Sequence, residues 1–290
     1  MDRRFAIRSP EARVGKTALI TGGAGAIATA LSRRLLQQGH DLVLVDLDED
    51  RLERAAQAAP GRIRTLCADL TREAGLAATV ACLRETPDLV LFVNNAGVIR
   101  PGDYADLTTA DIDLHMQVNL LAPLRLTHAA AQRFRGEGQG CILSIISAAG
   151  LVALPGSAAY SASKFGLRGL LIALAQELEP AGVRVRSLLP GAVDTPMLRY
   201  EATHGGSVLN FLNKDVLSVE EVAAAAMAAM DGRKIEVSLP ASDALLARLV
   251  CAFPALMPKV LPHFHKQGEA GLRRFIESRG LTRPADTPLT

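Results

Sequence analysis

The sequence predicts a doubly wound α/β fold, in which a parallel sheet is covered by helices on both faces. Short, almost wholly apolar runs alternate with longer segments of helical periodicity from about residue 15 to residue 240. Strands without an alternating polar side are buried on both faces, as in parallel sheets. The first apolar run also leads directly into a glycine-rich turn, which is typical of the first strand-to-helix connection in such sheets.

The individual elements follow from their own patterns. Apolar runs predict strands at 16–21, 41–46, 62–67, 89–93, 141–146, 183–189 and 234–239. Periodic apolar positions predict helices at about 30–39, 49–59, 72–85, 111–134, 157–179 and 219–230. The segment 197–213 shows no regular pattern and contains glycine, so we expect an irregular lid over a substrate. Together these elements indicate one three-layer, Rossmann-like domain.

We expect three parts along the chain. Residues 1–14 form a flexible N-terminal extension, residues 15–240 form a dinucleotide-binding catalytic domain, and residues 241–290 form a helical tail. Pro254, Pro258 and Pro262 exclude one straight helix in the tail, so bent helical pieces with one apolar face are expected. That face could cover the substrate pocket, contact a neighbouring subunit or, less favoured, lie on a membrane surface.

Composition narrows the class of protein. The 290 residues are 49% hydrophobic and 21% charged, which indicates a packed globular chain. The 32 Lys and Arg residues against 30 Asp and Glu residues give no electrostatic reason to expect nucleic acid as a partner. The four cysteines form no CxxC pair, so we expect neither a metal site nor a redox pair. Without an apolar signal segment or membrane-spanning run, the sequence predicts a soluble, cytoplasmic protein.

Tyr160 and Lys164 are four residues apart on a predicted helix and therefore share one face. A nearby ammonium favours the phenolate, so we expect Lys164 to lower the pKa of Tyr160 toward the range of a general base. A chance occurrence of this spacing remains the alternative, because many helices carry Tyr and Lys.

A cofactor site is predicted at the carboxyl ends of the strands. The glycines after the first strand would let the backbone approach a pyrophosphate, and the following helix N-terminus would stabilise its charge. Asp46 ends the second strand, where its carboxylate can accept both ribose hydroxyls and would repel the 2′-phosphate of NADP. The sequence thus favours NAD over NADP, unless Asp46 merely solvates the strand end.

Several motifs occur in a fixed order, each at a strand end or in a helix. They are Thr21-Gly-Gly-Ala-Gly-Ala-Ile-Ala28, Ala68-Asp-Leu70, Asn94-Asn-Ala-Gly97, Val118-Asn119, Ser144-Ile-Ile-Ser147, Tyr160-Ser-Ala-Ser-Lys164 and Pro190-Gly-Ala-Val-Asp-Thr195. With them the chain resembles the short-chain dehydrogenase/reductase family over about residues 15–240. The resemblance departs at Ala26 and Ala28, which stand where the family often has glycine. The methyl group of Ala26 would weaken or displace pyrophosphate binding.

The resemblance implies a role for each matching residue. Tyr160 would exchange a proton with the substrate oxygen, Ser147 would bond the same oxygen, Lys164 would hold the nicotinamide ribose and Asn119 would relay protons through water. Ser147 and Tyr160 would thus bind the substrate. The implied cofactor-binding residues are Gly22, Gly25, Ala26, Ile27, Asp46, Asp69, Leu70, Asn95, Ala96, Gly97, Tyr160, Lys164, Pro190, Val193 and Thr195. Asp69 could instead be a turn residue before the next helix.

We therefore expect an NAD-dependent dehydrogenase or ketone reductase for a bulky apolar alcohol, such as a steroid, lipid or terpenoid-like alcohol. The family resemblance also implies a homodimer or homotetramer formed through the helices at 111–134 and 157–179. A catalytically silent dinucleotide-binding scaffold or redox-sensing regulator remains the alternative. A peripheral membrane enzyme anchored by its tail is a further alternative.

Overall fold

A computed structural model describes residues 16–213, 215–253, 255 and 257–283. The predicted N-terminal extension and Pro254 lie outside these residues. Seven strands form one sheet in the order β3-β2-β1-β4-β5-β6-β7, and every neighbouring pair is parallel. They are β1 Lys16–Thr21, β2 His40–Asp46, β3 Ile63–Cys67, β4 Leu89–Asn94, β5 Gly140–Ile145, β6 Val183–Pro190 and β7 Glu236–Leu239. The predicted fold is confirmed.

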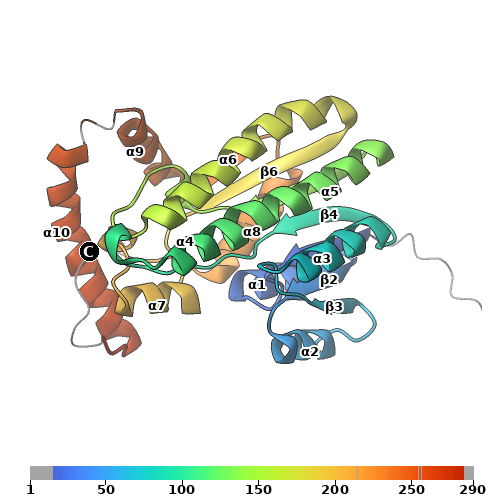
Figure 1. Ribbon diagram of the computed structural model, residues 1–290, viewed down its shortest axis with the longest axis horizontal. Coiled ribbons are helices and arrows are strands. Elements are labelled where there is room, and N and C mark those ends of the chain that lie inside the picture. The colour runs from blue at the N-terminus through green and yellow to red at the C-terminus, as the bar shows by residue number, and fades with distance from the viewer. Residues whose placement is uncertain (1–15, 214, 254, 256, 284–290) are drawn as a thin grey trace, which may run out of the picture.

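Helices cover both faces of this sheet (Figure 1). One face carries α1 Ala26–Gln37, α2 Glu49–Gln57 and α8 Val219–Asp231. The other carries α3 Glu73–Glu85, α4 Thr109–Met116, α5 Ala122–Glu137 and α6 Ala158–Leu178. The strand order reverses between β1 and β4, which is where ligands bind in open α/β sheets.

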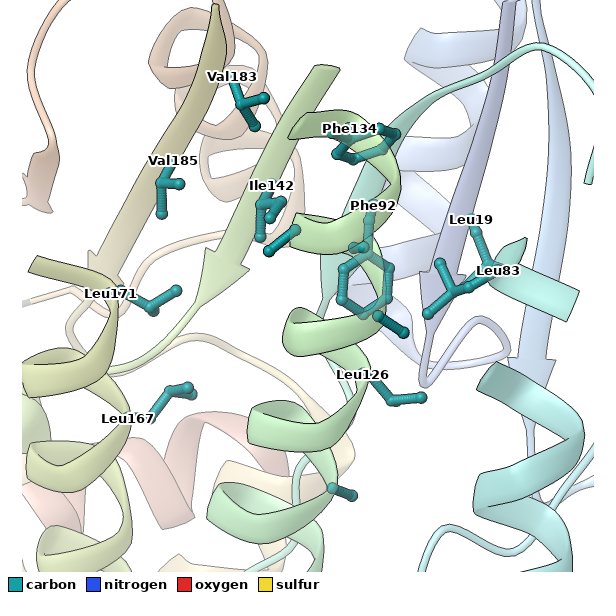
Figure 2. Close-up of a cluster of buried hydrophobic side chains, with 14 of the residues drawn as sticks. Leu19, Leu83, Phe92, Leu126, Phe134, Ile142, Leu167, Leu171, Val183 and Val185 are labelled. Atoms are coloured by element: carbon teal, nitrogen blue, oxygen red, sulfur yellow. The ribbon is translucent and has the colours of Figure 1, made fainter. Parts of the chain in front are cut away.

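The hydrophobic core is split into two layers by the sheet. Alternate side chains of a strand point to opposite faces, so Leu19 belongs to one layer and Ile20 to the other. Phe92 of β4 and Phe134 of α5 are fully buried in the layer beneath α3, α5 and α6 (Figure 2). This packing fixes the strand ends, from which the polar site residues project.

The predicted helix at 111–134 is interrupted near its middle. Residues Gln117–Leu121 form a π-helical turn between α4 and α5. Such single turns insert an extra residue into the helix and often occur at functional sites. Here the turn contains Asn119, which is fully buried.

The prediction of an irregular segment at 197–213 is wrong. The structure has a helix, α7, at Pro196–Thr203 and a 3₁₀ turn, η5, at Val208–Phe211. Thr195 caps α7 through a bond from the Leu198 N–H to its Oγ1, 3.3 Å long, and Pro196 suits the first helical position. The apolar side of α7 packs against the tail, a contact that local sequence patterns do not reveal.

The tail forms two helices, α9 at Ala241–Ala252 and α10 at Met257–Arg279 (Figure 1). The prediction of separate helical pieces is correct, although Pro262 lies within α10. Gly268 and Gly271 bring α10 directly onto the backbone of η5, because a Cβ at either position would overlap the carbonyl oxygen of Val208 or Phe211. No helix in the described part of the chain is long and apolar enough to cross a membrane.

Candidate active site

A pocket of about 140 Å³ opens at the carboxyl ends of the strands, beside the N-terminal half of α6. Ser147 after β5, Tyr160 and Lys164 on α6, and Thr195 before α7 all line it. These residues are distant in sequence, and the fold brings them together because parallel strands end at one edge of the sheet. The pocket therefore unites the three principal catalytic residues predicted from the sequence.

Tyr160 lies between several partners. Its ring meets the buried ring of His115 edge-on, with centroids 6.3 Å apart, and the Nζ of Lys164 lies 5.4 Å from its centroid. His115 is fixed by two backbone bonds: Nδ1–H donates to the Asp111 carbonyl oxygen at 2.7 Å, and Nε2 accepts from the Arg100 N–H at 3.0 Å. These bonds define the neutral tautomer of His115, and burial lowers the pKa of its ring.

The expectation that Lys164 lowers the pKa of Tyr160 is wrong for this structure. Burial raises the pKa of the Tyr160 phenol, the nearby Glu201 carboxyl raises it further, and a hydrogen bond with Ser147 opposes both effects. The four-residue spacing places the Lys164 ammonium over the ring, with its Nζ 5.4 Å from the ring centroid. No sequence motif marks Glu201 as a residue of the same pocket.

The ammonium group of Lys164 is buried, and few contacts offset the free-energy cost of its burial. It is 3% exposed, and no carboxylate in the described part of the chain pairs with it. Burial lowers the pKa of Lys164 from 10.5 to about 8. Its Nζ lies beside Gly97, where a Cβ would be 3.5 Å from Nζ and 3.4 Å from Asn119 Oδ1, so glycine leaves this point open. Such a cation suits the hydroxyls of a bound ribose.

Lys164→Met is expected to stabilise the protein while abolishing turnover. Because the folded-state pKa lies below the unfolded value, the unfolded chain binds the proton more tightly. Burial of the Lys164 ammonium therefore lowers the free energy of unfolding by up to about 3 kcal/mol. This destabilisation is present in full below pH ~8 and disappears as pH rises toward ~10.5. Urea unfolding at several pH values measures it, with the exposed Lys234→Met as control. A destabilised Lys164→Met variant at neutral pH would contradict this reasoning.

Asn119 braces the loop after β4. Its side-chain Oδ1 accepts from the Val98 N–H and its Nδ2 donates to the Val98 carbonyl oxygen, both at 2.9 Å. The same amide lies close to Gly97, next to Lys164. The contacts show a positioning role for Asn119, while the water relay implied by the resemblance stays a prediction.

The glycine-rich turn packs closely against the loop after β4 and leads into the N-terminus of α1. Gly22 has a left-handed φ of 62°, and a Cβ there would lie 2.8 Å from the Ala96 Cα. Asn95 Nδ2 donates to the carbonyl oxygens of Thr21 and Gly22 at 3.1 and 3.0 Å, tying this turn to β4. Helix α1 begins at Ala26 without a side-chain cap or an acid in its first turn, so its N-terminus is suited to a pyrophosphate.

Asp46 reaches back toward this turn. Its Oδ2 accepts from the Ala24 N–H at 2.9 Å, and its Oδ1 accepts from the N–H groups of Leu47 and Asp48 at 2.7 and 3.2 Å. The carboxylate is thus held at the end of β2, next to the turn. These residues fit the phosphate and ribose groups of a dinucleotide. Ala28 is fully buried where α1 packs on the sheet, which suits a small residue.

The remaining predicted cofactor residues occupy the same edge of the sheet. Ile27, Pro190, Val193 and Thr195 line the pocket, and Leu70 packs against the core. Asp69 accepts bonds from the Thr71 N–H and hydroxyl at 2.9 and 2.6 Å, which makes it the turn residue before α3. These bonds lower the pKa of Asp69. Its contact with adenine stays a prediction.

Three pocket residues were not found by sequence reasoning. Glu201 of α7, Asn210 of η5 and Ser157 before α6 line the same cavity as Tyr160. Their positions depend on how α7 and η5 fold over the strand ends, and no motif marks them.

A second, larger cavity of about 310 Å³ adjoins the first. The two cavities share Ala148, Leu154, Gly191, Ala192 and Asn210 as lining residues. The outer walls are mostly apolar and come from η5, α9 and α10, including Leu209, Val250, Val260, Leu261 and Phe264. The tail thus encloses a space that continues from the candidate catalytic groups.

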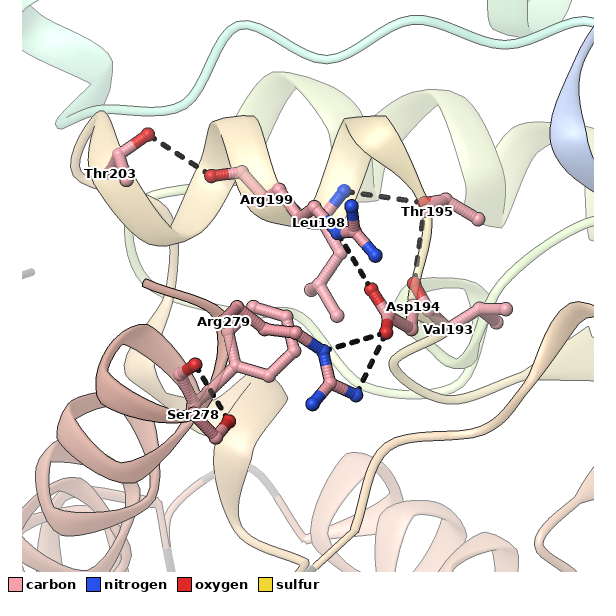
Figure 3. Close-up of polar contacts among 9 residues, drawn as sticks. Val193, Asp194, Thr195, Leu198, Arg199, Thr203, Ser278 and Arg279 are labelled. Atoms are coloured by element: carbon pink, nitrogen blue, oxygen red, sulfur yellow. Dashed lines mark hydrogen bonds and ion pairs between the residues drawn. The ribbon is translucent and has the colours of Figure 1, made fainter. Parts of the chain in front are cut away.

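The end of α10 is joined by ion pairs to the loop after β6, between Val193 and Thr195 (Figure 3). Arg279 donates from Nε and Nη2 to Asp194 Oδ2, both at 2.9 Å, and Arg199 Nε donates to Oδ1 at 2.9 Å. Asp194 stands between Val193 and Thr195. Burial opposes ionisation of Asp194, but the two guanidinium groups outweigh it and lower its pKa. The tail is therefore coupled to the loop after β6.

Comparison with known proteins places this architecture in a family. The profile described as short chain dehydrogenase matches residues 16–205. Oxidoreductase UcpA of Salmonella typhimurium is 36% identical over 188 residues, which are 63% of this chain and 71% of UcpA.

Two solved structures are similar in fold and sequence. A short-chain dehydrogenase from Sphingobium yanoikuyae in complex with NADPH superposes with a TM-score of 0.72 and 33% identity, covering 84% of this chain and 95% of the other. The bulky-bulky ketone specific alcohol dehydrogenase from Comamonas testosteroni gives 0.69 and 30%, covering 84% and 94%. The fold and the pocket define a Rossmann-fold oxidoreductase. Because the profile spans well over half the chain, the protein belongs to the short-chain dehydrogenase/reductase family.

Proposed function

We propose that this protein transfers a hydride between NAD(H) and a bulky apolar secondary alcohol or ketone. The observation that carries the proposal is one pocket holding Ser147, Tyr160 and Lys164, with the glycine-rich turn at one side and the apolar tail cavity at the other. The similar alcohol dehydrogenase from Comamonas testosteroni is specific for ketones with two bulky substituents, which supports this substrate class.

Each group of site residues would have a separate role in the proposed reaction. A bound nicotinamide supplies or accepts the hydride. The glycine-rich turn, Asp46 and Lys164 would hold the dinucleotide, while Ser147 would hydrogen-bond the substrate oxygen and stabilise charge developing on it. Tyr160 would exchange the proton with that oxygen.

The cofactor proposed is NAD rather than NADP. The Asp46 carboxylate at the end of β2 would repel a 2′-phosphate, although the similar Sphingobium enzyme binds NADPH. We expect at least about tenfold preference for NAD in kcat/KM, equivalent to roughly 1.4 kcal/mol. In Asp46→Asn, which keeps the size but removes the charge, the preference should shrink. Equal rates of the wild-type chain with both cofactors would remove this part of the proposal.

The substrate class is tested by measuring NADH absorbance with secondary alcohols that range from small cyclic alcohols to sterols. Activity that increases with apolar bulk supports the proposal, because the second cavity adds apolar volume next to the catalytic groups. Turnover confined to the smallest alcohols would contradict the bulky-substrate part. A homodimer or homotetramer formed through the long helices, and a cytoplasmic location, remain predictions.

A further inference from the structure

Glu201 is a carboxyl group inside the catalytic pocket that the proposed reaction does not use. It belongs to α7, is 8% exposed and lines the same cavity as Ser147, Tyr160 and Lys164. A buried carboxyl is costly unless it is paired or hydrogen-bonded. Its only side-chain hydrogen bond to the described residues comes from Asn210 Nδ2, which donates to Oε1 at 3.2 Å. The other carboxyl oxygen accepts no hydrogen bond from the described residues.

Asn210 places this carboxyl at a particular point of the pocket. It lines both the catalytic cavity and the apolar tail cavity, so the Glu201–Asn210 pair lies where the two spaces meet. The pair is held in place by its surroundings: Leu198 and Ala202 of α7, Phe211 of η5 and Leu272 of α10 form one buried cluster. A substrate that extends from Tyr160 into the tail cavity would lie near this polar pair, because Asn210 is one of the residues that line both cavities.

A second unsatisfied polar group lines the same cavity. Ser157 is 4% exposed, and its hydroxyl has no hydrogen-bond partner in the described part of the chain. Buried hydroxyl groups are normally hydrogen-bonded, so Ser157 is a further polar group without a partner beside this cavity. The catalytic cavity thus offers more polar groups than the reduction of a single carbonyl requires.

The protonation state of Glu201 decides what it can bind. Burial raises the pKa of Glu201 to about 8, and the bond from Asn210 only partly opposes this effect. At neutral pH the group is then mostly a neutral carboxylic acid, which can donate a hydrogen bond from its O–H. Such a donor suits a carbonyl or hydroxyl oxygen, whereas an ionised carboxylate would suit an ammonium group.

We propose that Glu201, held by Asn210, donates a hydrogen bond to a second oxygen of the substrate. The preferred substrates would then be apolar ketones or alcohols with another carbonyl or hydroxyl near the reacting carbon, on the side of the tail cavity. This inference rests on the proposed hydride transfer at Tyr160, and it narrows the substrate class of that same site.

Matched pairs of ketones test the inference. Propiophenone is compared with its diketone acetylbenzoyl, and butyrophenone with its diketone benzoylacetone; in each pair one methylene is replaced by a carbonyl. The proteins are the wild-type chain, Glu201→Gln and Glu201→Leu. The Gln side chain keeps the size of Glu201, an oxygen that can accept the bond from Asn210, and an N–H donor toward the cavity. The Leu side chain has a similar volume but lacks both the acceptor and the donor. Thermal unfolding checks that all three fold.

The readout is the ratio of kcat/KM for diketone over ketone in NADH-dependent reduction. The intrinsic reactivity of the diketone cancels between variants. We expect Glu201→Leu to lower the ratio roughly tenfold in at least one pair, the effect of one lost hydrogen bond, while Glu201→Gln stays within about threefold of wild type. An unchanged ratio in Glu201→Leu for both pairs would overturn the inference. So would a Glu201→Gln ratio as low as that of Glu201→Leu, which would indicate that an ionised carboxylate is needed.

A pH series separates hydrogen-bond donation from a structural role. Raising the pH through about 8 ionises Glu201 and should lower the acetylbenzoyl ratio of the wild-type chain, while Glu201→Gln keeps its ratio. Of the residues lining the cavity, Tyr160 and Lys164 also titrate. A change in their protonation alters kcat/KM for the ketone and for the diketone alike, so it cancels in the ratio of the two values. Benzoylacetone is left out because it loses a proton in alkaline solution. Parallel behaviour of wild type and Glu201→Gln would overturn the inference.

Calorimetric titration keeps the inference apart from the proposed function. The wild-type chain should bind acetylbenzoyl more tightly than propiophenone, and Glu201→Leu should lose most of this difference. If the wild-type chain reduced none of the four compounds, the proposed hydride transfer would be contradicted for these ketones. The titration measures binding without turnover, so it would still test the role of Glu201. A wild-type chain that binds acetylbenzoyl no more tightly than propiophenone would overturn the inference.

Discussion

Tyr160→Phe is expected to lower kcat by about 10²–10⁴-fold, because it removes the hydroxyl that exchanges a proton with the substrate oxygen. The ring would stay in place, since its contacts with His115 and Lys164 do not involve the hydroxyl. Dinucleotide binding should therefore change little, and loss of the hydrogen bond with Ser147 should lower the free energy of unfolding by only about 1 kcal/mol. The measurements are steady-state NADH absorbance, calorimetric titration with NAD and thermal unfolding.

Tyr104→Phe is the matched control for this prediction. The chain has three tyrosines, and Tyr104 is 56% exposed, outside the pocket. Its variant should retain wild-type turnover. If Tyr160→Phe also retained turnover, the phenol would not take part in the chemistry. The alternative of a dinucleotide-binding scaffold or redox-sensing regulator would then be favoured.

Gly271→Ala is expected to destabilise the protein and to impair the pocket. A Cβ at this position would overlap the Phe211 carbonyl oxygen, so α10 must move away from η5. Overpacking of this kind costs about 1–3 kcal/mol, or a fall in Tm of about 3–10 °C. Because η5 also carries Asn210, KM for bulky substrates should rise.

Gly136→Ala provides the control for this steric effect. Gly136 lies in α5, and a Cβ there would meet no heavy atom within 4 Å. Alanine is the better helix former, so this variant should be neutral or slightly more stable. A Gly271→Ala variant as stable as Gly136→Ala would show that α10 does not pack on η5 in solution.

The strands and most of the proposed catalytic residues were predictable because they depend on local patterns. Strands β1 and β4 are apolar and buried on both sides, and the motif residues follow directly at their ends. Ser147, Tyr160 and Lys164 also meet in one pocket, as the resemblance implied. The direction of the Tyr160 pKa was not predictable, because it depends on burial and on Glu201, which is 41 residues further along the chain.

The folding of segment 197–213 was missed for a related reason. Its helix α7 is stabilised by the Thr195 cap and by contact with Leu272 and Phe275 of α10, far away in sequence. The sequence likewise left open whether the tail covers a pocket, joins a neighbour or lies on a membrane. The structure packs α10 against α7 and η5 beside the substrate side of the pocket.

The amino-acid sequence by itself determined the family, the parallel sheet and the choice of Ser147, Tyr160 and Lys164 as the proposed catalytic residues. These features are set by short-range periodicity and by residues at strand ends, which parallel strands carry to one edge. Only the tertiary structure decided how α7, η5 and α10 enclose the pocket, and that Glu201 is buried inside it. Such placements arise from packing between segments that are distant in sequence. The burial and the pKa of a carboxyl group depend on its neighbours, so they follow only from the folded structure.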